Sequence, residues 1–314
     1  MKKSLLITAI AVSLFSACKR EHTAATDPSG KKYKVNFNVT NFASKQNAFA
    51  LKRKAGPSEA VVQAPSYIVD VLHYLVYDGQ DNFLKEVVQD STMSNFGIIT
   101  DSLQAGTYHI TLVAGKKGLV TRPGLLAPND YSYGGNSWQD TFFGSFTINI
   151  GTGNITADVT LSRVVGKLEV ILTDNIPLNA DSLIIATNQE AYGQDLFQGF
   201  FTFGAFINVR FAVAIPDSAK GKPNFTIDRL IGNCTSQFPL EIICKAADNT
   251  NIASTTVQNV TVLADQKTIV SGDLFASLAG HNSQQQFTTK IDTAWGTATT
   301  QSSFSLRTQK SGNH

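Results

Sequence analysis

From residue 33 onward, apolar residues recur at every second position in short runs, and this period of two constrains the fold more than any other feature. Val35, Phe37 and Val39, for example, are separated by Asn36 and Asn38. Such runs are rich in β-branched and aromatic residues, and clusters of Gly, Asn and Asp divide them. Helical periodicity is almost absent. We therefore expect an all-β protein built from many short strands.

The strand pattern occurs in two series. The first is expected to include a hairpin, Val69–Tyr77 and Phe83–Gln89, whose connection Asp78–Asn82 contains Gly79. Further strands of the first series are expected after Gly106, over 142–150 and over 155–161. The strands expected in the second series cover 168–172, 183–186, 225–230, 240–244, 255–263 and 268–275. The restart near Val165-Gly166 predicts two tandem β-sandwiches, residues 33–165 and residues 166–314, the second with a polar tail.

The longest regular run lies in the second series. From Phe197 to Ile215 nearly every odd position is apolar, with Gly199 as the exception. A period of two held that long indicates one unusually long strand or two strands that break near Gly204-Ala205. We favour a strand buried locally on both faces over an apolar partner surface.

Composition narrows the class of protein. Charged residues make up 16% of the 314 residues against about 25% in typical domains, whereas the 42% hydrophobic share is enough to build cores. Removing a signal of 17 residues leaves 314 − 17 = 297 residues, and the loss of Lys2 and Lys3 brings the formal charge from 26 − 24 = +2 to 24 − 24 = 0. A chain without net positive charge is a poor nucleic-acid binder, so that class is set aside.

The N-terminus reads as an export signal followed by a lipid attachment site. Lys2-Lys3 precedes an apolar stretch, Leu5–Phe15, that is too short for a membrane span, and residues 1–17 form the expected signal peptide. The string Leu14–Cys18 resembles the bacterial lipobox, in which the thiol of the cysteine is acylated, for example with palmitate. Two or three acyl chains would hold the protein at a membrane. Residues 18–32 are then a polar, lipidated tether.

Signatures of catalysis, metals and cofactors do not occur in the sequence. The five histidines are scattered at positions 22, 73, 109, 281 and 314, and none has zinc-ligand spacing. Asp78, Asp81 and Asn82 are interpreted as turn residues, because their spacing matches no calcium loop. With no nucleophile elbow, phosphate loop or dinucleotide fingerprint, acyl transfer, nucleotide hydrolysis and hydride transfer have no support, and we expect no enzyme, no metal site and no cofactor. A glycosidase-like enzyme is a distant third alternative, because its carboxylate pair would come together only in the fold.

The stretch Arg122–Asp140 reads as a long loop that carries Tyr131, Tyr133 and Trp138. Exposed aromatics on such a loop can stack on sugar rings, which makes glycan binding an alternative function. Loops of this size also use aromatics to cap the end of a sandwich, and we consider capping the commoner outcome.

Cys234 and Cys244 are the other two cysteines. In an oxidising compartment they could form a disulfide, with Pro239 between them marking a turn. Closing that loop would contribute about 2.5–3 kcal/mol in the chain-entropy model. Two buried free thiols are the equal alternative.

A set of motifs follows one order along the chain. They are the lipobox Cys18, a first strand Tyr33–Phe42, Val71–Asp78, Phe83-Leu84, Leu103–Tyr108, Val113–Gly115, Val159–Leu168 and Gly272–Phe275. Together they resemble the fimbrillin superfamily of Bacteroides-type bacteria, and most of all its fimbrial anchor and minor-subunit lipoproteins.

The resemblance implies two transthyretin-like β-sandwiches on a lipoprotein of the outer membrane, at the cell surface, with other fimbrial subunits as partners. It implies no reaction. In shaft members a protease cuts after the first strand, that strand leaves, and a strand of a neighbouring subunit fills the groove. Leu51–Gly56, with Arg53 at its centre, would suit such a protease, and the same basic run could be a solvated loop. The tail from His281 offers few alternating apolar residues for a donor strand.

Overall fold

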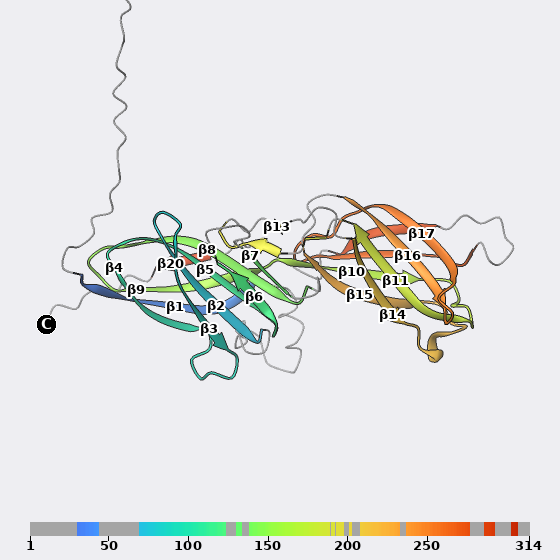
Figure 1. The fold of residues 1–314 in the computed structure, drawn as a ribbon, viewed down its shortest axis with the longest axis horizontal. Coiled ribbons are helices and arrows are strands. Elements are labelled where there is room, and N and C mark those ends of the chain that lie inside the picture. Colours follow the sequence, from blue (N-terminus) through green and yellow to red (C-terminus); the bar gives the residue numbers. More distant parts are fainter. Residues whose placement is uncertain are drawn as a thin grey trace, which may run out of the picture.

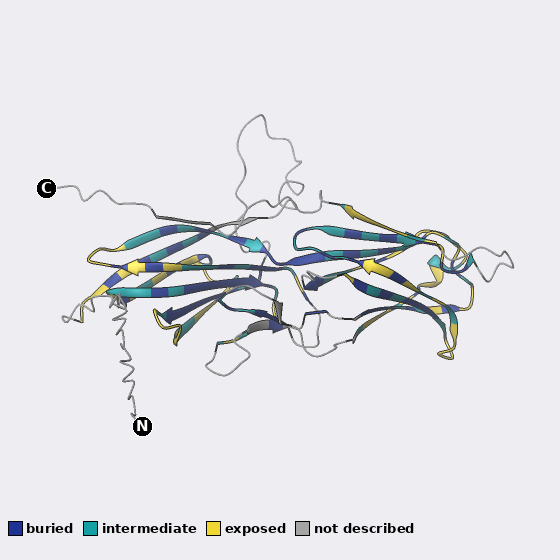
Figure 2. Cartoon of the chain, turned by 90° about the horizontal axis from the view of Figure 1, so that it is seen from above, coloured by how far each residue is buried: buried dark blue, intermediate teal, exposed yellow. Residues whose placement is uncertain are grey.

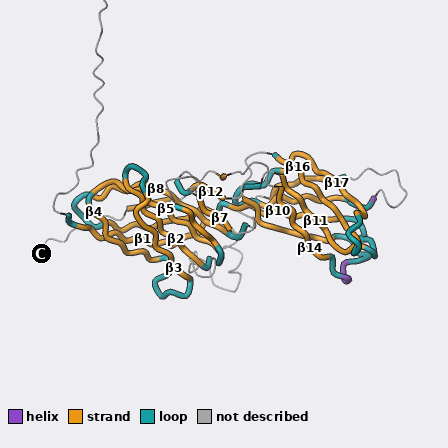
Figure 3. Tube along the Cα trace, viewed as in Figure 1, coloured by secondary structure: helices purple, strands orange, loops and turns teal. Residues whose placement is uncertain are grey.

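The structure is a computed structural model that describes residues 30–43, 69–123, 130–133, 138–188, 190–191, 193–197, 201–202, 208–232, 237–276, 286–292 and 303–306. Strands dominate these residues, and helical residues are confined to short 3₁₀ turns such as Asp217–Ala219 (Figures 1 and 3). The expected all-β class is confirmed. In the described part of the chain, no helix has the length and apolar character needed to cross a membrane.

The first half of the molecule is an eight-stranded sheet folded over on itself. Only two residue pairs, Phe142 with Arg163 and Phe143 with Ser162, join β8 to β9, so the sheet bends there into the layers β3-β2-β5-β8 and β4-β1-β9-β20. Its strands are β1 Lys32–Ala43, β2 Val71–Asp78, β3 Phe83–Asp90, β4 Ile98–Gln104, β5 Gly106–Gly115, β8 Thr141–Ile150, β9 Ile155–Arg163 and β20 Ser303–Leu306. The expected hairpin is confirmed as β2 and β3.

Alternate residues of these strands face each other between the two layers and form one hydrophobic core (Figure 2). It includes Phe37 of β1, Tyr74 of β2, Leu112 of β5 and Leu161 of β9, all almost fully buried. The period of two read from the sequence is the period of burial in β1 and β9, whereas β2 and β5 are buried on both faces over most of their length.

The second half has the same plan with separate sheets, β15-β10-β18-β19 and β14-β11-β16-β17, around its own core. Its strands are β10 Val165–Leu172, β11 Ala180–Asn188, β14 Asn208–Ala214, β15 Phe225–Gly232, β16 Phe238–Ala246, β17 Asn251–Val260, β18 Lys267–Gly272 and β19 Phe287–Asp292. The expected polar tail thus contributes β19 to this half and β20 to the first.

A small sheet joins the two halves. Its order is β13-β12-β7-β6, with β6 Leu119–Arg122, β7 Asp130–Tyr133, β12 Gly193–Asp195 and β13 Phe201–Thr202. Beneath it lies a third hydrophobic cluster, drawn from both series of strands, that includes Tyr77, Trp138, Val165 and Leu196. The halves are therefore packed against each other and not merely linked. A domain boundary at residues 165–166 stays a prediction.

Arg163, at the end of β9, is the polar centre of this joint. Its Nε and Nη2 atoms donate to Asp140 at 2.7 and 3.0 Å, and its Nη1 donates to Asp265 at 2.9 Å. The side chains of Arg163 and Asp265 are 1% and 5% exposed. Because Asp265 lies between β17 and β18, this buried ion pair ties the first sandwich to the second.

The long alternating run Phe197–Ile215 does not form one strand. Its described parts include β13 and β14, which lie in different sheets, and residues 203–207 lie outside the described residues. The expectation of a strand buried on both faces is wrong for β14. That strand is at a sheet edge, paired with β11 alone, and its Phe211 is 36% exposed.

Two further sequence interpretations need correction. Pro239 does not mark a turn, because it lies inside β16 at a register shift against β17 between Phe238 and Leu240. A proline cannot donate to the ladder, and such an irregularity accommodates it. Arg122–Asp140 is not one long loop, because β7 lies within it and pairs with β6 and β12.

Candidate assembly site

β1, the first strand of the described residues, lies between two neighbours. On one side β1 pairs in parallel with β9, from Val35 opposite Ile155 to Ala43 opposite Ser162. On the other side it pairs in antiparallel fashion with β4, from Lys32 opposite Gln104 to Asn38 opposite Ile98. Both edges of the β1 backbone are therefore hydrogen-bonded, and the strand fills a slot in its sheet.

The inward face of β1 is part of the first core. Val35 and Phe37 are fully buried, and Val39 is nearly so. The Phe37 ring lies 5.8 Å from the ring of Tyr74 and 5.6 Å from that of Phe146, measured between centroids. Burying side chains of this size contributes about 1.5–3 kcal/mol each. Burial of these three side chains therefore stabilises β1 in its slot.

The outward face of β1 fixes its register. Asn36 donates to Thr156 on β9 at 3.5 Å and accepts from Thr100 on β4 at 3.0 Å. Asn38 donates to Asp158 on β9 at 3.1 Å. Because a slip by one residue would turn the asparagines into the core, these polar contacts and the apolar face specify the same alignment.

Strands around the β1 slot, β2 and β3 in one layer and β4 in the other, also contact each other directly. The hydroxyl group of Tyr74 donates to Asp101 on β4 at 2.9 Å, and Lys85 on β3 forms an ion pair with the same carboxylate. Burial, and then the charge of Asp101, raises the pKa of Tyr74, so the hydroxyl stays a hydrogen-bond donor. The two layers are thus linked across the core near the β1 slot.

Removal of β1 would expose apolar pockets and leave two strand edges, on β9 and β4, without partners. Such an edge is a template for another extended chain, which would supply backbone hydrogen bonds and fill alternate pockets with side chains. The arrangement can therefore hold a strand by addition, with its own β1 as the present occupant. Sequence analysis located β1 but not β4, whose Thr100 and Asp101 complete the slot, because only Ile99 and Leu103 of that polar strand are buried.

Several residues predicted from the sequence cannot be placed. Cys18, Arg53 and Cys234 lie outside the described residues. Cys244, in the middle of β16, is a buried free thiol, and burial raises its pKa to about 11. The disulfide between Cys234 and Cys244 stays a prediction.

Trp138 is buried, as the favoured capping interpretation expects, and does not lie on a sugar-contact surface. Trp138 is 4% exposed, its Nε1 donates to the carbonyl of Ala191 at 2.7 Å, and its indole ring packs on Gly232 so closely that a Cβ there would lie 2.5 Å away. An aromatic that fills the joint between the halves cannot stack on a sugar ring. Tyr131 and Tyr133 lie in β7.

The titratable groups of the first half are engaged in packing. Nδ1 of His73 lies 2.6 Å from Glu86, and Nε2 of His109 lies 2.5 Å from Ser145. Burial lowers the pKa of His109. Asp78 is confirmed as a turn residue, because its carboxylate accepts from the backbone N–H groups of Gln80 and Asn82. No group of His, Cys, Asp and Glu with the arrangement of a metal site occurs among the described residues.

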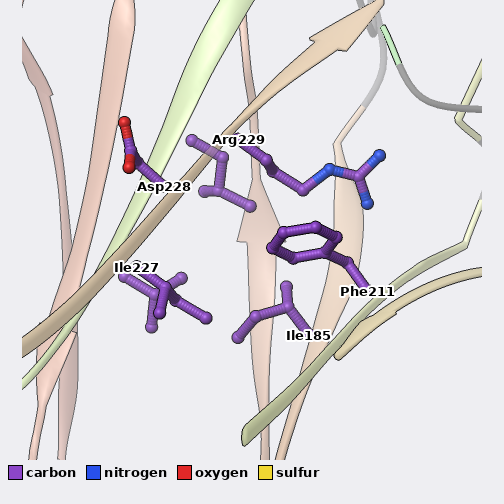
Figure 4. A pocket seen from close by; sticks show the side chains of 7 residues that line it. Ile185, Phe211, Ile227, Asp228 and Arg229 are labelled. Atoms are coloured by element: carbon purple, nitrogen blue, oxygen red, sulfur yellow. The ribbon is translucent and has the colours of Figure 1, made fainter. Parts of the chain in front are cut away.

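A shallow pocket opens at one edge of the second half, between β14 and β15 (Figure 4). It has no room for a water molecule and is lined by Leu168, Val170, Ile185, Phe211, Ile227, Asp228 and Arg229. The Arg229 guanidinium lies over the Phe211 ring, 5.5 Å from its centroid, and donates to both oxygens of buried Glu190 at 2.7 and 2.8 Å. Burial raises the pKa of Glu190 to about 7, and Arg229 opposes that rise. We interpret this pocket as the closed edge of a core.

Comparison with known families gives two matches, each covering more than half of the chain. The sequence pattern of the fimbrillin-A associated anchor proteins Mfa1 and Mfa2 matches residues 34–199, which contain β1 except for its first two residues, together with β4 and β9 on either side of it. A family of unknown function, DUF6562, matches residues 125–306. No curated protein matches the chain by sequence.

One solved structure with a TM-score above 0.5 shows the same fold at low sequence identity. The fimbrial anchor protein Mfa2 from Porphyromonas gingivalis is 11% identical, with a TM-score of 0.51 over 84% of this chain and 98% of that one. A C-terminally truncated tip fimbrial protein, Mfa3, from the same organism is 12% identical, with a TM-score of 0.41 over 83% of this chain and 99% of that one.

Proposed function

We propose a structural role in fimbriae for this chain, which belongs to the family of fimbrillin-A associated anchor proteins and, over its second part, to the family DUF6562. In this role it is an anchor or minor subunit that binds other fimbrial subunits at the cell surface. We propose no catalytic reaction for it. The observation that carries the proposal is the position of β1, a buried strand held by backbone pairing on both edges.

Strand addition at the β1 slot is the proposed means of assembly. A donor strand from another subunit would replace the backbone bonds to β9 and β4, and its alternate apolar side chains would enter the sites of Val35, Phe37 and Val39. The asparagine contacts to Thr156 and Asp158 would select strands that carry hydrogen-bonding residues at the outward positions. Two modes are consistent with this proposal: a shaft-type subunit loses β1 after cleavage at Arg53, and an anchor-type subunit keeps β1 and binds its neighbours intact.

We propose that acylation of Cys18 holds the protein on the outer membrane, with the residues between Cys18 and β1 as the tether. The supporting observation is the small-residue cleavage site directly before the cysteine. Cys18→Ser should shift the protein from the detergent phase to the aqueous phase. Unchanged partitioning of this variant would refute the lipid anchor.

Controlled proteolysis tests the assembly mode. Purified lipid-free protein is treated with a trypsin-like protease, and its size is followed by light scattering. The control carries alanine in place of Lys52, Arg53 and Lys54. A shaft-type subunit should become a polymerising species only when Arg53 is present, whereas an anchor-type subunit should stay monomeric and bind a fimbrial subunit without being cut. Clean cleavage with no growth, and no binding to fimbrial subunits before or after it, would reject both modes.

A further inference from the structure

The two halves of the molecule repeat one strand arrangement, and the repeat can be followed pair by pair. β10 lies between antiparallel β15 and parallel β18, as β1 lies between antiparallel β4 and parallel β9. In the opposite layers, β14-β11-β16-β17 corresponds to β3-β2-β5-β8. The eight strands of one half therefore have counterparts in the other, and β9 corresponds to β18.

This correspondence extends to the outer edges of β9 and β18. On the side away from β10, β18 pairs in antiparallel fashion with β19 over six residue pairs. On the side away from β1, residues Ala157–Thr160 of β9 pair in antiparallel fashion with β20. The first half thus receives its last strand from the C-terminal segment, in the place that β19 takes in the second half.

We infer that the outer edge of β9 is a second strand-acceptor site, and that its occupant is the chain's own segment Ser303–Leu306, bound within the same molecule. This inference goes beyond the proposed fimbrial role and does not depend on it, since the site lies on the opposite edge of β9 from the β1 slot.

The register supports a specific site. Phe304 stands opposite Val159 and Leu306 opposite Ala157, and both of these β9 residues face the first core. Ser303 and Ser305 alternate with them, opposite Thr160 and Asp158. The apolar residues of this otherwise polar segment therefore stand opposite those β9 residues that belong to the first core. The bend between β8 and β9 leaves this edge of β9 without β8, because those two strands share only two residue pairs. A strand edge without a partner leaves backbone N–H and C=O groups unpaired, and an added strand can pair with them.

The connection to this site is short. β19 ends with Asp292 opposite Lys267, and β20 begins with Ser303 opposite Thr160, three residues before the end of β9. Lys267 also pairs with Lys167, near the start of β10, so both ends of the connection lie toward the joint between the halves. The ten intervening residues, 293–302, can span up to about 33–36 Å. Binding within one molecule therefore requires no second chain.

A disulfide trap in the full-length lipid-free protein tests the pairing. With Cys234→Ser as background, Thr160→Cys is combined with its register partner Ser303→Cys. In a β-pair the Cα atoms of such partners lie about 4.5–5.5 Å apart, within the range of a disulfide. Mild oxidation should give a disulfide-linked monomer, identified by peptide mapping and by its faster migration without reductant.

The matched control combines Ser303→Cys with Thr156→Cys, four positions away along the same strand. That displacement is about 13 Å, beyond disulfide reach. Equal yields in the two variants, no disulfide in the first, or a disulfide-linked dimer in place of the monomer would each overturn the inference.

A peptide experiment tests the site as an acceptor. The chain is truncated after residue 298 and mixed with a labelled peptide of residues 299–310, and binding is followed by fluorescence anisotropy. The truncated chain should bind the peptide at least tenfold more tightly than the full chain, which already carries the segment. A peptide with Phe304→Asp and Leu306→Asp should bind at least tenfold more weakly than the unmodified one. Equal affinity for both chains, or for both peptides, would contradict the proposed site.

Discussion

β1 and β10 occupy the same place in the two halves of the molecule, yet they differ in how the chain continues from them. β10 follows β9 after the single residue Val164, and β11 follows it within the second half. β1 is the first strand of the described residues, and residues 44–70 separate it from β2. One cut in that stretch would free β1 from the body, whereas no single cut would free β10. Exchange of a strand therefore depends on how the chain connects it, because the pairing and burial of β1 and β10 are alike.

The largest effect is expected where the two halves meet. Arg163→Met should remove the cation shared by Asp140 and Asp265 and leave the buried Asp265 carboxylate without its counterion. Breaking a buried ion pair in this way costs about 3–5 kcal/mol. Chemical denaturation should show the loss, with the exposed pair Arg210–Glu241 as the control. Arg210→Ala should cost no more than about 1 kcal/mol. A similar small loss for Arg163→Met would mean that the halves are held by apolar packing alone.

A matched pair of valines tests the equivalence of β1 and β10. Val35 in β1 and Val170 in β10 both belong to a hydrophobic core and are 0% and 1% exposed. Val35→Ala and Val170→Ala should each lower the free energy of unfolding by about 1.5–3 kcal/mol, the value of a buried side chain of this size. After cleavage at Arg53, only Val35→Ala should speed release of the β1 fragment in gel filtration. Faster release with Val170→Ala as well would show that β1 is not an independent unit.

The start of β10 offers a smaller test. A Cβ on Gly166 would lie 2.3 Å from the carbonyl oxygen of Leu263, a contact that requires the backbone to move. Gly166→Ala should therefore destabilise the protein by about 1–3 kcal/mol through overpacking. Gly151→Ala is the control, because nothing lies within 4 Å of a Cβ there, and its thermal midpoint should be close to that of the parent. Equal midpoints for the two variants would show that the approach of β10 to Leu263 is not tight.

A pH dependence is expected from Glu190, whose carboxylate accepts from Arg229 of β15 in the second half. Burial raises the pKa of Glu190 from 4.5 to about 7. Below pH 4.5 the carboxyl is protonated in both states, and between 4.5 and 7 only the unfolded chain releases the proton, so stability falls as the pH rises through this window. Glu190→Gln should flatten that slope in urea titrations at pH 5 and pH 7.5. A variant as pH-dependent as the parent would assign the slope to other groups.

Strands with clear alternation could be predicted from sequence because their period is also their period of burial, as Val35, Phe37 and Val39 show. β4 was missed, since its outward face carries polar residues and only Ile99 and Leu103 mark the core. β20 was missed because four residues with two apolar side chains give no local signal, and its partner lies more than a hundred residues away. For Trp138, sequence left capping and sugar contact open with capping favoured, because a loop sequence does not reveal that a second half will cover the ring.

The direction of β1 has a mechanical consequence. β1 begins at the end of the first half that lies away from the second half and runs along the long axis toward the joint (Figure 1). Its hydrogen bonds to β9 and β4 lie across that axis, so a pull on the N-terminal side along the axis loads them in shear. Bonds loaded in shear resist together, whereas bonds in an unzipped strand break one after another. A tether attached at this end would load all the backbone hydrogen bonds of β1 at once. The strand that one cut can free is therefore also well oriented to bear a load while the chain is intact.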